Sequence, residues 1–337
     1  MNILRLVTPG FSAATLLLAA FLSAANPAAA QADKDPGPTL GRIAEERVIN
    51  LGHREAATPF SYVIPSPEVI GSDTSAGYSW DICLKIVDAL EKRVGQKIEV
   101  RPVTMPANTR IMMVKVGIAD IECGSTTNTV ARQKQVAFSN TFYIADVRIM
   151  VRKDKSIRSL GDLNGRRVVT TLGTTADRLI KQQAFARNLS IDYVIGRNYA
   201  ESMALMNAGR ADAFVGDDAI IAAERVGSPL KDKLAFLDET LSTEPYGLML
   251  PRDDPQFKKF VDEVLVDLMN SGELARLYDK WFMNPIPPQG INLQIFDGKG
   301  SLSTLTAISE GADTIGIASL ATMSLGGLLH GAGLNFV

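Results

Sequence analysis

Hydrophobic residues recur along this chain with two spacings, every second residue and every fourth residue, in alternating segments. In the segment 47–52 apolar and polar positions alternate up to a glycine, as in a strand that leads into a loop. A four-residue spacing follows, at Ile82, Ile86, Leu90 and Val94, and Gly95 comes directly after it. This spacing predicts a helix with Asp81 as its N-cap or first-turn acid and with Gly95 at its C-terminal end.

The same alternation of strand and helix continues to about residue 282. Strands are predicted at 97–104, 119–123, 166–171, 190–196 and 213–216, and helices at 108–116, 176–184, 199–208, 255–271 and 273–282. Such alternation is typical of α/β folds, in which helices cover parallel sheets. Two extended stretches, 145–151 and 244–250, separate one α/β unit from the other. We therefore expect two lobes and two hinge crossings.

The first thirty residues have the pattern of a secretory signal peptide. Arg5 precedes an apolar run at 13–25, and a small-residue cleavage site ends at Ala30. The apolar run is shorter than the roughly 20 residues that cross a bilayer. Because no cysteine lies in or just after it, no acceptor for a lipid anchor is present. We expect cleavage after Ala30 and a soluble periplasmic protein.

The predicted domain limits follow from these patterns. A mature chain of about 300 residues is long enough for two cores, because single cores seldom grow beyond ~250–300 residues. We expect a first part of lobe 1, then lobe 2, a return to lobe 1, and a loosely ordered tail that lacks charge from 314 on but contains five glycines there. The limits are 1–30 for the signal peptide, 40–145, 146–244 and 245–295 for the lobes, and 296–337 for the tail.

Charge and cysteine content exclude some functions and leave one question open. The net charge is −2, and it becomes −3 without the signal peptide, whose single charged residue is Arg5. A chain this close to neutral is a poor partner for nucleic acid. His53 and His330 are too far apart in sequence to indicate a metal site. Cys83 and Cys123 could form a disulfide in an oxidising compartment or stay as two buried thiols.

Polar residues that can bind a ligand follow several of the predicted strands. Arg54 follows the first strand, and Ser125 and Thr127 follow the third, with Arg132 in the next helix. In the second lobe, Thr175 follows the first strand and Asp217 ends a later one. In open α/β sheets, ligands bind at the carboxyl ends of strands, where helix N-termini supply free N–H groups.

This mixture of groups suits a zwitterionic amino acid. Arg132 would hold the α-carboxylate and Asp217, as the single acid of the site, the α-ammonium. The hydroxyls of Ser125, Thr127 and Thr175 would complete the hydrogen bonds. Two further arginines, Arg54 and Arg110, are then left for an anionic side chain. We therefore predict an acidic amino acid as the ligand.

Structural interpretations of the same residues are available. Arg54 could be a solvated loop residue, and Ser125–Thr127 could simply cap the following helix. Of the neighbouring acids Asp217 and Asp218, we expect Asp218 to cap a helix. Tyr78 and Trp80 are expected in the core or at its rim.

Several long motifs resemble one known family. They are GHREAATPFSY (52–62), GYSWDICLKIV (77–87), ECGSTTNTVARQKQVAFSNT (122–141), LGTTAD (172–177), GDDAIIAAER (216–225), PRDDPQFKKFVD (251–262) and SGELARLYDKWFMNPIPP (271–288). Over about residues 40–295 the chain is similar to the periplasmic glutamate/aspartate-binding proteins of ABC transporters. The resemblance implies solute-binding protein family 3 and a two-lobed type II periplasmic-binding-protein fold.

The resemblance also implies the site roles and the partners. It gives Arg132 the α-carboxylate, Asp217 the α-ammonium, and Arg54 and Arg110 the side-chain carboxylate. Members of the family often carry histidine where this chain has Tyr199, so the contact from that element departs from the pattern. The implied partners are L-glutamate or L-aspartate and the membrane permease of an ABC transporter; we expect a monomer without cofactor.

Two other functions remain as alternatives. The same fold class includes a dehydratase of cyclic carboxylic acids, for which Glu122 and Glu201 would be the candidate general acids. A ligand-sensing module that reports to a separate membrane partner is the other. We expect a binding protein rather than an enzyme.

Overall fold

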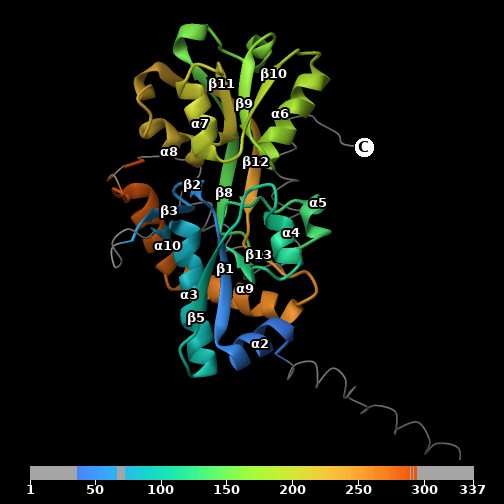
Figure 1. Ribbon diagram of the computed structural model, residues 1–337, viewed down its shortest axis with the longest axis vertical. Coiled ribbons are helices and arrows are strands. Elements are labelled where there is room, and N and C mark those ends of the chain that lie inside the picture. Colours follow the sequence, from blue (N-terminus) through green and yellow to red (C-terminus); the bar gives the residue numbers. More distant parts are fainter. Residues whose placement is uncertain (1–35, 67–72, 289, 291, 294–337) are drawn as a thin grey trace, which may run out of the picture.

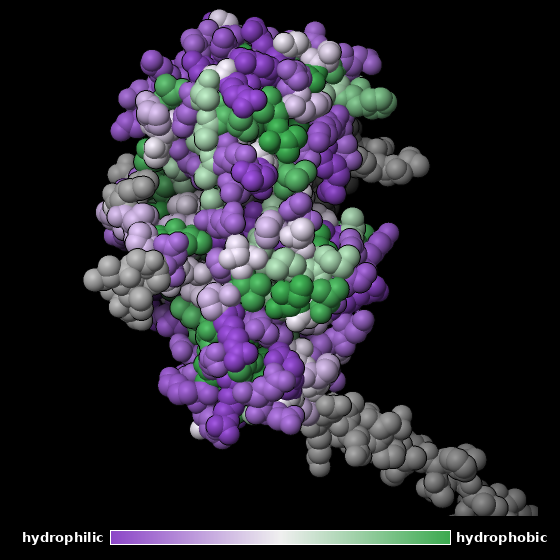
Figure 2. All heavy atoms as spheres, in the orientation of Figure 1, coloured by the Kyte–Doolittle hydropathy of each residue, from purple (hydrophilic) through white to green (hydrophobic). Residues whose placement is uncertain are grey.

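The computed structural model describes residues 36–66, 73–288, 290, 292 and 293, which form two lobes, each built on a five-stranded sheet (Figure 1). The predicted signal peptide (1–30) and the predicted tail (296–337) lie outside the described residues. On the face seen in Figure 2, side chains of the two lobes meet across the middle of the molecule, and hydrophobic residues gather at the surface of lobe 1. Among the described residues, the exposed large hydrophobic side chains of lobe 1 are Leu84, Met112, Val116, Ile118, Val130 and Met283.

Lobe 1 contains the sheet β5-β1-β6-β13-β7. Strand β1 runs parallel to its neighbours β5 and β6, whereas β13 is antiparallel to β6 and β7. A smaller antiparallel sheet, β2-β3-β4, lies beside it. The strands are β1 (Val48–His53), β2 (Ala56–Ala57), β3 (Ser61–Pro65), β4 (Asp73–Ala76), β5 (Glu99–Thr104), β6 (Ile121–Glu122), β7 (Ala137–Phe138) and β13 (Met249–Leu250). The helices are α2 (Pro38–Glu46), α3 (Tyr78–Val94), α4 (Arg110–Lys115), α5 (Val130–Gln133), α9 (Pro255–Asn270) and α10 (Glu273–Tyr278), which continues into a π-helical turn, Asp279–Met283.

Lobe 2 contains the sheet β10-β9-β11-β8-β12. Strands β10, β9 and β11 are parallel, as the alternation of strands and helices predicts. The elements are β9 (Arg167–Thr171), α6 (Thr175–Ala186), β10 (Asp192–Gly196), α7 (Tyr199–Asn207), β11 (Ala213–Asp217) and α8 (Asp218–Val226). Short 3₁₀ turns occur at Lys153–Lys155, Leu160–Leu163 and Lys231–Lys233.

Two long strands carry the chain between the lobes. β8 (Tyr143–Arg152) and β12 (Leu234–Tyr246) pair antiparallel from Tyr143 opposite Tyr246 to Arg152 opposite Leu234. In Figure 1 they run from the upper lobe down toward the lower one. The extended crossings predicted at 145–151 and 244–250 lie on these strands and on β13.

Aromatic rings fasten the lower ends of the hinge strands to lobe 1. Phe60 lies 4.7 Å from Tyr143 and 5.2 Å from Tyr246 between ring centroids. Tyr143 also stacks on Phe282 at 5.3 Å. Tyr78, fully buried, completes the cluster, in agreement with its predicted place in the core. Aromatic pairs of this kind add about 0.5–1.5 kcal/mol each beyond the burial of their area.

Helix α3 begins earlier than its hydrophobic spacing suggests. Its N-cap is Gly77, and Asp81 lies in the first turn, where its carboxylate accepts hydrogen bonds from Lys280 and from Trp281 Nε1 at 2.7 Å. Gly77 has φ +132°, and a Cβ there would lie 2.3 Å from the carbonyl oxygen of Phe60. Only glycine fits this close approach. Gly95 ends the helix in the left-handed conformation, as predicted.

Of the two alternatives for the cysteines, the structure contains the disulfide. Cys83 on α3 is bonded to Cys123, which directly follows β6, and both residues are fully buried. The bond attaches α3 to the sheet two residues before Ser125.

Candidate functional site

All eight residues predicted for the ligand site are buried, and they come from both lobes. Lobe 1 contributes Arg54, Arg110, Ser125, Thr127 and Arg132, and lobe 2 contributes Thr175, Tyr199 and Asp217. Each is between 2% and 6% exposed. For three arginines and an aspartate, such burial is unusual without a partner of opposite charge.

Arg110 and Arg132 are held by neutral oxygens of lobe 1. Arg110 Nε donates to Thr126 Oγ1 at 2.7 Å, and Arg110 Nη1 donates to the carbonyl oxygen of Ala107. Arg132 Nη1 donates to the carbonyl oxygen of Thr127 at 2.8 Å. Throughout the part of the chain that the structure describes, neither they nor Arg54 form an ion pair within 4.0 Å.

The charges of these arginines act on one another. Burial, followed by repulsion from Arg132 and Arg54, lowers the pKa of Arg110 to about 9. Burial also lowers the pKa of Arg132, although Glu244 opposes this shift. Lobe 1 therefore presents a buried cationic wall that an anion would stabilise.

Arg132 reaches this wall because of the cap of α5. Thr129, and not the Ser125–Thr127 segment, is the N-cap: its Oγ1 accepts the backbone N–H of Arg132 at 3.2 Å. The alternative interpretation of Ser125–Thr127 as a helix cap is therefore wrong, because the chain turns into the helix two residues later. Ser125 Oγ is buried and has no hydrogen-bond partner among the described residues.

Asp217 ends β11 with one carboxylate oxygen satisfied and one open. Its Oδ2 accepts hydrogen bonds from the hydroxyls of Tyr246 at 2.5 Å and Tyr199 at 3.3 Å. Within the described residues its Oδ1 is buried without a partner. Burial, with repulsion from Glu244 next, raises the pKa of Asp217 to about 7. The prediction that Asp218 caps the following helix is wrong, because Asp217 is the N-cap of α8 and Asp218 is its first helical residue; Asp218 Oδ1 accepts the backbone N–H of Ala219 at 2.7 Å within the first turn.

Glu244 is a functional candidate that the sequence did not reveal. It lies on hinge strand β12 and is 7% exposed. Its Oε2 accepts hydrogen bonds from Thr127 and from Thr175, both at 2.6 Å. The two threonine hydroxyls are 3.4 Å apart and come from different lobes. The only sequence signal was its position on a predicted crossing, where a polar side chain meets both lobes.

Glu122 is a third carboxylate at the site. It is fully buried, and neither carboxylate oxygen has a hydrogen-bond partner in the described structure. A Cβ on Gly124 would lie 2.0 Å from Glu122 Oε1 and 3.1 Å from Arg54 Cγ, which places Glu122 beside Arg54. The expectation of a single acid is therefore wrong, because Asp217, Glu244 and Glu122 all lie close to the arginines. Glu201, by contrast, pairs with Arg197 at 2.9 Å on the surface.

The lobes also touch at the edges of the site. Asn198 Nδ2 of lobe 2 donates to Glu55 Oε2 of lobe 1 at 3.0 Å. A Cβ on Gly173, just before α6, would lie 2.5 Å from Cα of Asn108 in lobe 1. The structure is therefore a closed arrangement of the two lobes.

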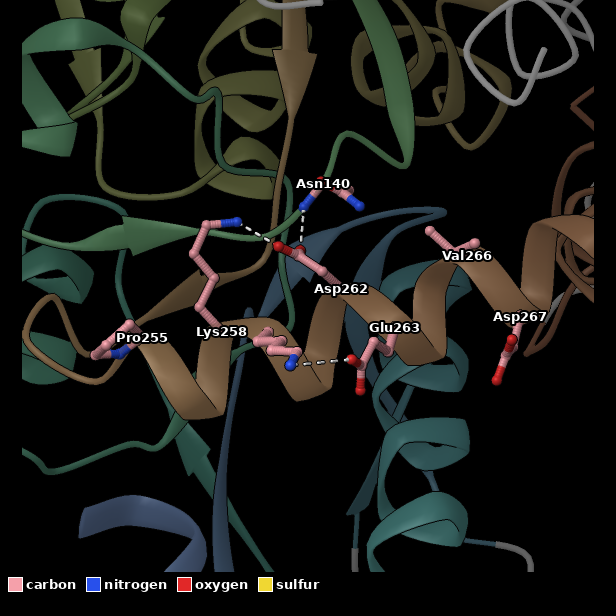
Figure 3. A pocket seen from close by; sticks show the side chains of 8 residues that line it. Asn140, Pro255, Lys258, Asp262, Glu263, Val266 and Asp267 are labelled. Carbon is pink, nitrogen blue, oxygen red and sulfur yellow. Dashed lines mark hydrogen bonds and ion pairs between the residues drawn. The ribbon is translucent and has the colours of Figure 1, made fainter. Parts of the chain in front are cut away.

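Surface pockets lie elsewhere on lobe 1. One of about 480 Å³ follows helix α9, where Asp262 accepts the backbone N–H of Asn140 at 2.6 Å and pairs with Lys258 (Figure 3). Another, of about 340 Å³, is lined by residues that include Lys115, Lys134 and Arg252. Neither contains any of the eight predicted residues. Among the described residues we find no group of three or more potential metal ligands and no helix long and apolar enough to cross a membrane.

Comparison with known proteins places this geometry in context. Residues 49–284 match the family model of bacterial extracellular solute-binding proteins, family 3. The glutamate/aspartate import solute-binding protein of Escherichia coli is 37% identical over 83% of this chain and 91% of its own length. The L-glutamate/L-aspartate-binding protein of Pseudomonas aeruginosa is 39% identical with the same two coverages.

Among solved structures, an ancestral amino acid-binding protein described as a precursor of cyclohexadienyl dehydratase is also similar. It has a TM-score of 0.62 and 26% identity over 72% of this chain and 99% of its own. These likenesses confirm the predicted two-lobed type II periplasmic-binding-protein fold.

Proposed function

Because the chain belongs to family 3 of the bacterial extracellular solute-binding proteins, as its motifs predicted, we propose that it captures L-glutamate or L-aspartate between its two lobes. The observation that carries the proposal is a set of three buried arginines that form no ion pair within 4.0 Å among the described residues, together with an aspartate that has one carboxylate oxygen without a partner there. An acidic amino acid supplies two carboxylates to the arginines and an ammonium group to the acid.

In this assignment the α-carboxylate lies on Arg132, and the α-ammonium donates to Asp217 Oδ1. The side-chain carboxylate lies on Arg54 and Arg110. Tyr199 contributes through Asp217, which its hydroxyl contacts at 3.3 Å. Each charge-assisted hydrogen bond adds roughly 1.5–3 kcal/mol net, so a handful is enough for the ~8 kcal/mol of a micromolar complex.

Closure follows from the origin of these groups. The arginines belong to lobe 1 and Asp217 to lobe 2, so only the closed arrangement gives the ligand all of its contacts. A ligand shifts the equilibrium toward closure by as much as its affinity differs between the two arrangements. We propose the limits 40–145, 146–244 and 245–295 for the parts that move, and closed protein as the form that an ABC permease recognises.

Glutamine is discriminated by charge. Its side-chain amide would leave a buried arginine without an anion, at a cost of about 3–5 kcal/mol. We also propose export with cleavage after Ala30 and a monomeric protein that needs no cofactor; the family relationship supports the periplasmic location.

A binding role is favoured over the dehydratase alternative. Of the two candidate general acids, Glu201 is paired on the surface, and the matched relatives are named as binding proteins. Incubation with arogenate or prephenate tests this part: product formation would contradict it.

Calorimetry with glutamate, aspartate and glutamine tests the main proposal. We expect micromolar or tighter binding of one or both acidic amino acids and binding of glutamine weaker by about 10²-fold or more. Native mass spectrometry of freshly purified protein should detect glutamate or aspartate. Equal affinity for glutamine and glutamate would contradict the assignment of Arg54 and Arg110.

A further inference from the structure

One carboxylate joins three segments of the closed molecule. Glu244 Oε2 accepts hydrogen bonds from Thr127, which follows β6 of lobe 1, and from Thr175, the first residue of α6 in lobe 2, both at 2.6 Å. Its Oε1 accepts a hydrogen bond from Ser242 at 3.1 Å on the same hinge strand. Opening the lobes must separate Thr127 from Thr175, and so must break at least one of these bonds.

These bonds decide what the two threonines can offer to a ligand. A hydroxyl has one hydrogen to donate and two lone pairs that accept. Since Thr127 and Thr175 each give their hydrogen to Glu244, their oxygens are left as acceptors. They cannot then donate to a ligand carboxylate, but they can accept from an ammonium group. The sequence predicted only that these hydroxyls form hydrogen bonds with the ligand; the bonds to Glu244 indicate that they accept them.

The two threonine oxygens lie near charged groups of both lobes. The negative charge of Glu244 lies close enough to Asp217 and Arg132 to add to the raised pKa of Asp217 and to oppose the lowering of the pKa of Arg132. The open oxygen of Asp217 is a further acceptor on the lobe 2 side. An ammonium group has three N–H donors in need of acceptors, and the two hydroxyl oxygens and Asp217 Oδ1 supply three.

We propose that Glu244 is a positioning residue that determines specificity for α-amino groups: it orients Thr127 and Thr175 as acceptors, and it does so only when the lobes are closed. The inference rests on the proposed function and extends it to a residue that does not itself need to touch the ligand. If Glu244 only locks the lobes together, its replacement should weaken the binding of every ligand by the same factor. If Glu244 orients acceptors, its replacement should weaken only the binding of ligands that carry the ammonium group.

The test compares glutamate with glutarate, which has the same two carboxylates and carbon chain but no amino group. Both are titrated into wild-type protein and Glu244→Gln by calorimetry, with glutarate also measured by displacement of glutamate. We expect Glu244→Gln to weaken glutamate by about 10- to 100-fold, because an oriented charge-assisted contact is lost. Glutarate should bind within twofold of wild type or more tightly, since a nearby negative charge has been removed.

Two further variants separate the inference from a general loss of structure. Thr175→Val keeps the carboxylate but removes one acceptor, and should weaken glutamate alone. Glu239→Gln makes the same change elsewhere on β12, where Glu239 accepts the backbone N–H of Leu160 at 3.3 Å, and should change neither affinity. Thermal unfolding of each variant verifies that it is folded.

The outcomes are distinct. Equal losses for glutamate and glutarate in Glu244→Gln would overturn the inference and leave Glu244 as a lobe lock. Unchanged glutamate affinity would overturn it as well. Wild-type protein that binds neither glutamate nor aspartate would instead overturn the proposed function, and the inference with it.

Discussion

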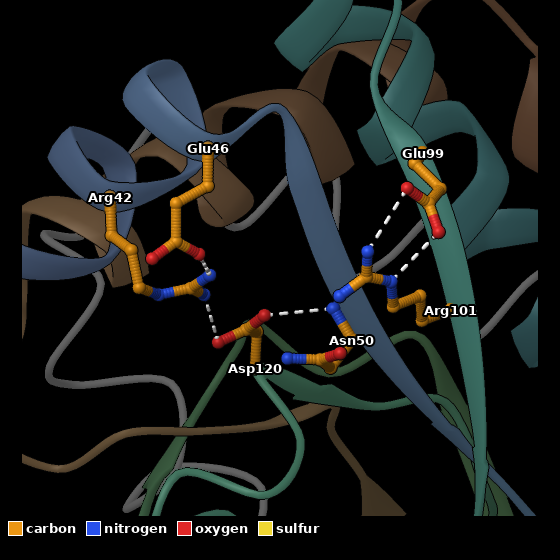
Figure 4. Close-up of polar contacts among 6 residues, drawn as sticks. All are labelled: Arg42, Glu46, Asn50, Glu99, Arg101 and Asp120. Atoms are coloured by element: carbon orange, nitrogen blue, oxygen red, sulfur yellow. Dashed lines mark hydrogen bonds and ion pairs between the residues drawn. The ribbon is translucent and has the colours of Figure 1, made fainter.

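The arginines at the two ends of the lobe 1 sheet differ in their exposure and in their ion pairs. Near the starts of β1, β5 and β6, Arg42 contacts Asp120 at 2.5 Å and Glu46 at 3.0 Å, and Arg101 pairs with Glu99 at 2.7 Å (Figure 4). These side chains remain in contact with solvent, with 32% of Arg42 and 56% of Arg101 exposed. Asp120 also accepts the backbone N–H of Asn50 at 2.8 Å and so fixes the beginning of β1.

At the carboxyl ends of the same strands, Arg54, Arg110 and Arg132 are buried and, among the described residues, form no ion pair within 4.0 Å. Surface pairs are worth about 0–1 kcal/mol, whereas a buried charge without a partner costs several. An arrangement that costs stability and lies between two lobes marks a functional site, because a bound ligand can supply the opposite charge that these arginines lack in the folded protein. The contrast indicates which arginines stabilise the fold and which bind the ligand.

The largest expected effect comes from removing a guanidinium at the unpaired end. Arg132→Ala should weaken glutamate by about 10²- to 10³-fold in calorimetry, because the ligand's α-carboxylate would be enclosed without its cation. Arg101→Ala is the matched control at the paired end. It should leave affinity unchanged and alter the free energy of unfolding by no more than about 1 kcal/mol. A loss below tenfold in Arg132→Ala would contradict the assignment.

A second variant tests whether the unpaired end functions only in closed protein. Gly173→Ala places a Cβ 2.5 Å from Asn108 Cα across the lobes and should weaken glutamate by about 10- to 100-fold through strain of roughly 1–3 kcal/mol. Gly165→Ala is the control, because Gly165 has a similar φ of +71° but nothing within 4 Å of its added Cβ.

Small-angle scattering completes this test. With saturating glutamate, wild type and Gly165→Ala should contract, and Gly173→Ala should remain more extended. Equal contraction and equal affinity in both variants would mean that the Gly173 contact plays no part in closure.

The sequence was sufficient for most helices and strands, although not for α2, β2, β3, β4 and β7, and for several charged residues of the site, for a physical reason. Strand and helix periodicity is local, and the positions after strands are determined by it, so Asp217 could be placed at the end of a strand and Arg132 in the helix after one from spacing alone. The roles of Arg54 and Arg110 came from resemblance together with the charges left over.

What the sequence did not reveal depends on contacts between distant segments. Glu244 becomes a site residue only because β12 lies against β8 and its carboxylate meets Thr127 and Thr175, which are 117 and 69 residues away. Likewise, the start of α3 at Gly77 is set by its packing against Phe60, which no periodicity encodes. Tertiary contacts decided both.

The comparison also predicts a dependence on pH that belongs to the binding end alone. In ligand-free protein, burial and then Glu244 raise the pKa of Asp217 to about 7. Folded protein therefore holds a proton that the unfolded chain has lost, so this group's contribution to stability falls as the pH rises from about 4 to 7.

Binding has the opposite sign, because an ammonium group needs the ionised carboxylate. Affinity for glutamate should fall by up to about tenfold per pH unit below pH 7 and level off above it. Calorimetry between pH 5 and 8 in buffers of different ionisation enthalpy would measure the proton released on binding. Asp217→Asn should bind weakly, without this slope. A flat profile in wild-type protein would show that Asp217 is already ionised before the ligand arrives.

The smallest expected effect concerns Tyr199, at the position where the resemblance led us to expect histidine in many relatives. Its hydroxyl donates to Asp217 Oδ2 at 3.3 Å, while Tyr246 donates to the same oxygen at 2.5 Å. Tyr199→Phe removes the longer of the two bonds and should weaken glutamate binding by about two- to tenfold, a modest loss because at 3.3 Å this hydrogen bond to the carboxylate is long. Because less of the negative charge on Asp217 is then stabilised, the pH below which affinity falls should move upward.

Tyr199→His separates the two possible reasons for the departure. If the position serves only Asp217, histidine should restore much of the affinity lost in Tyr199→Phe, and it should do so equally for glutamate and aspartate. If the residue at this position contacts the ligand's side chain, the ratio of the affinities for glutamate and aspartate should change. Such a contact is consistent with the position of Tyr199, which lies close enough to Arg54 and Arg110 for their charges to act on its pKa. Calorimetry of both ligands on both variants decides between these roles, and with them whether lobe 2 contributes to the choice of side chain or only holds the α-amino group.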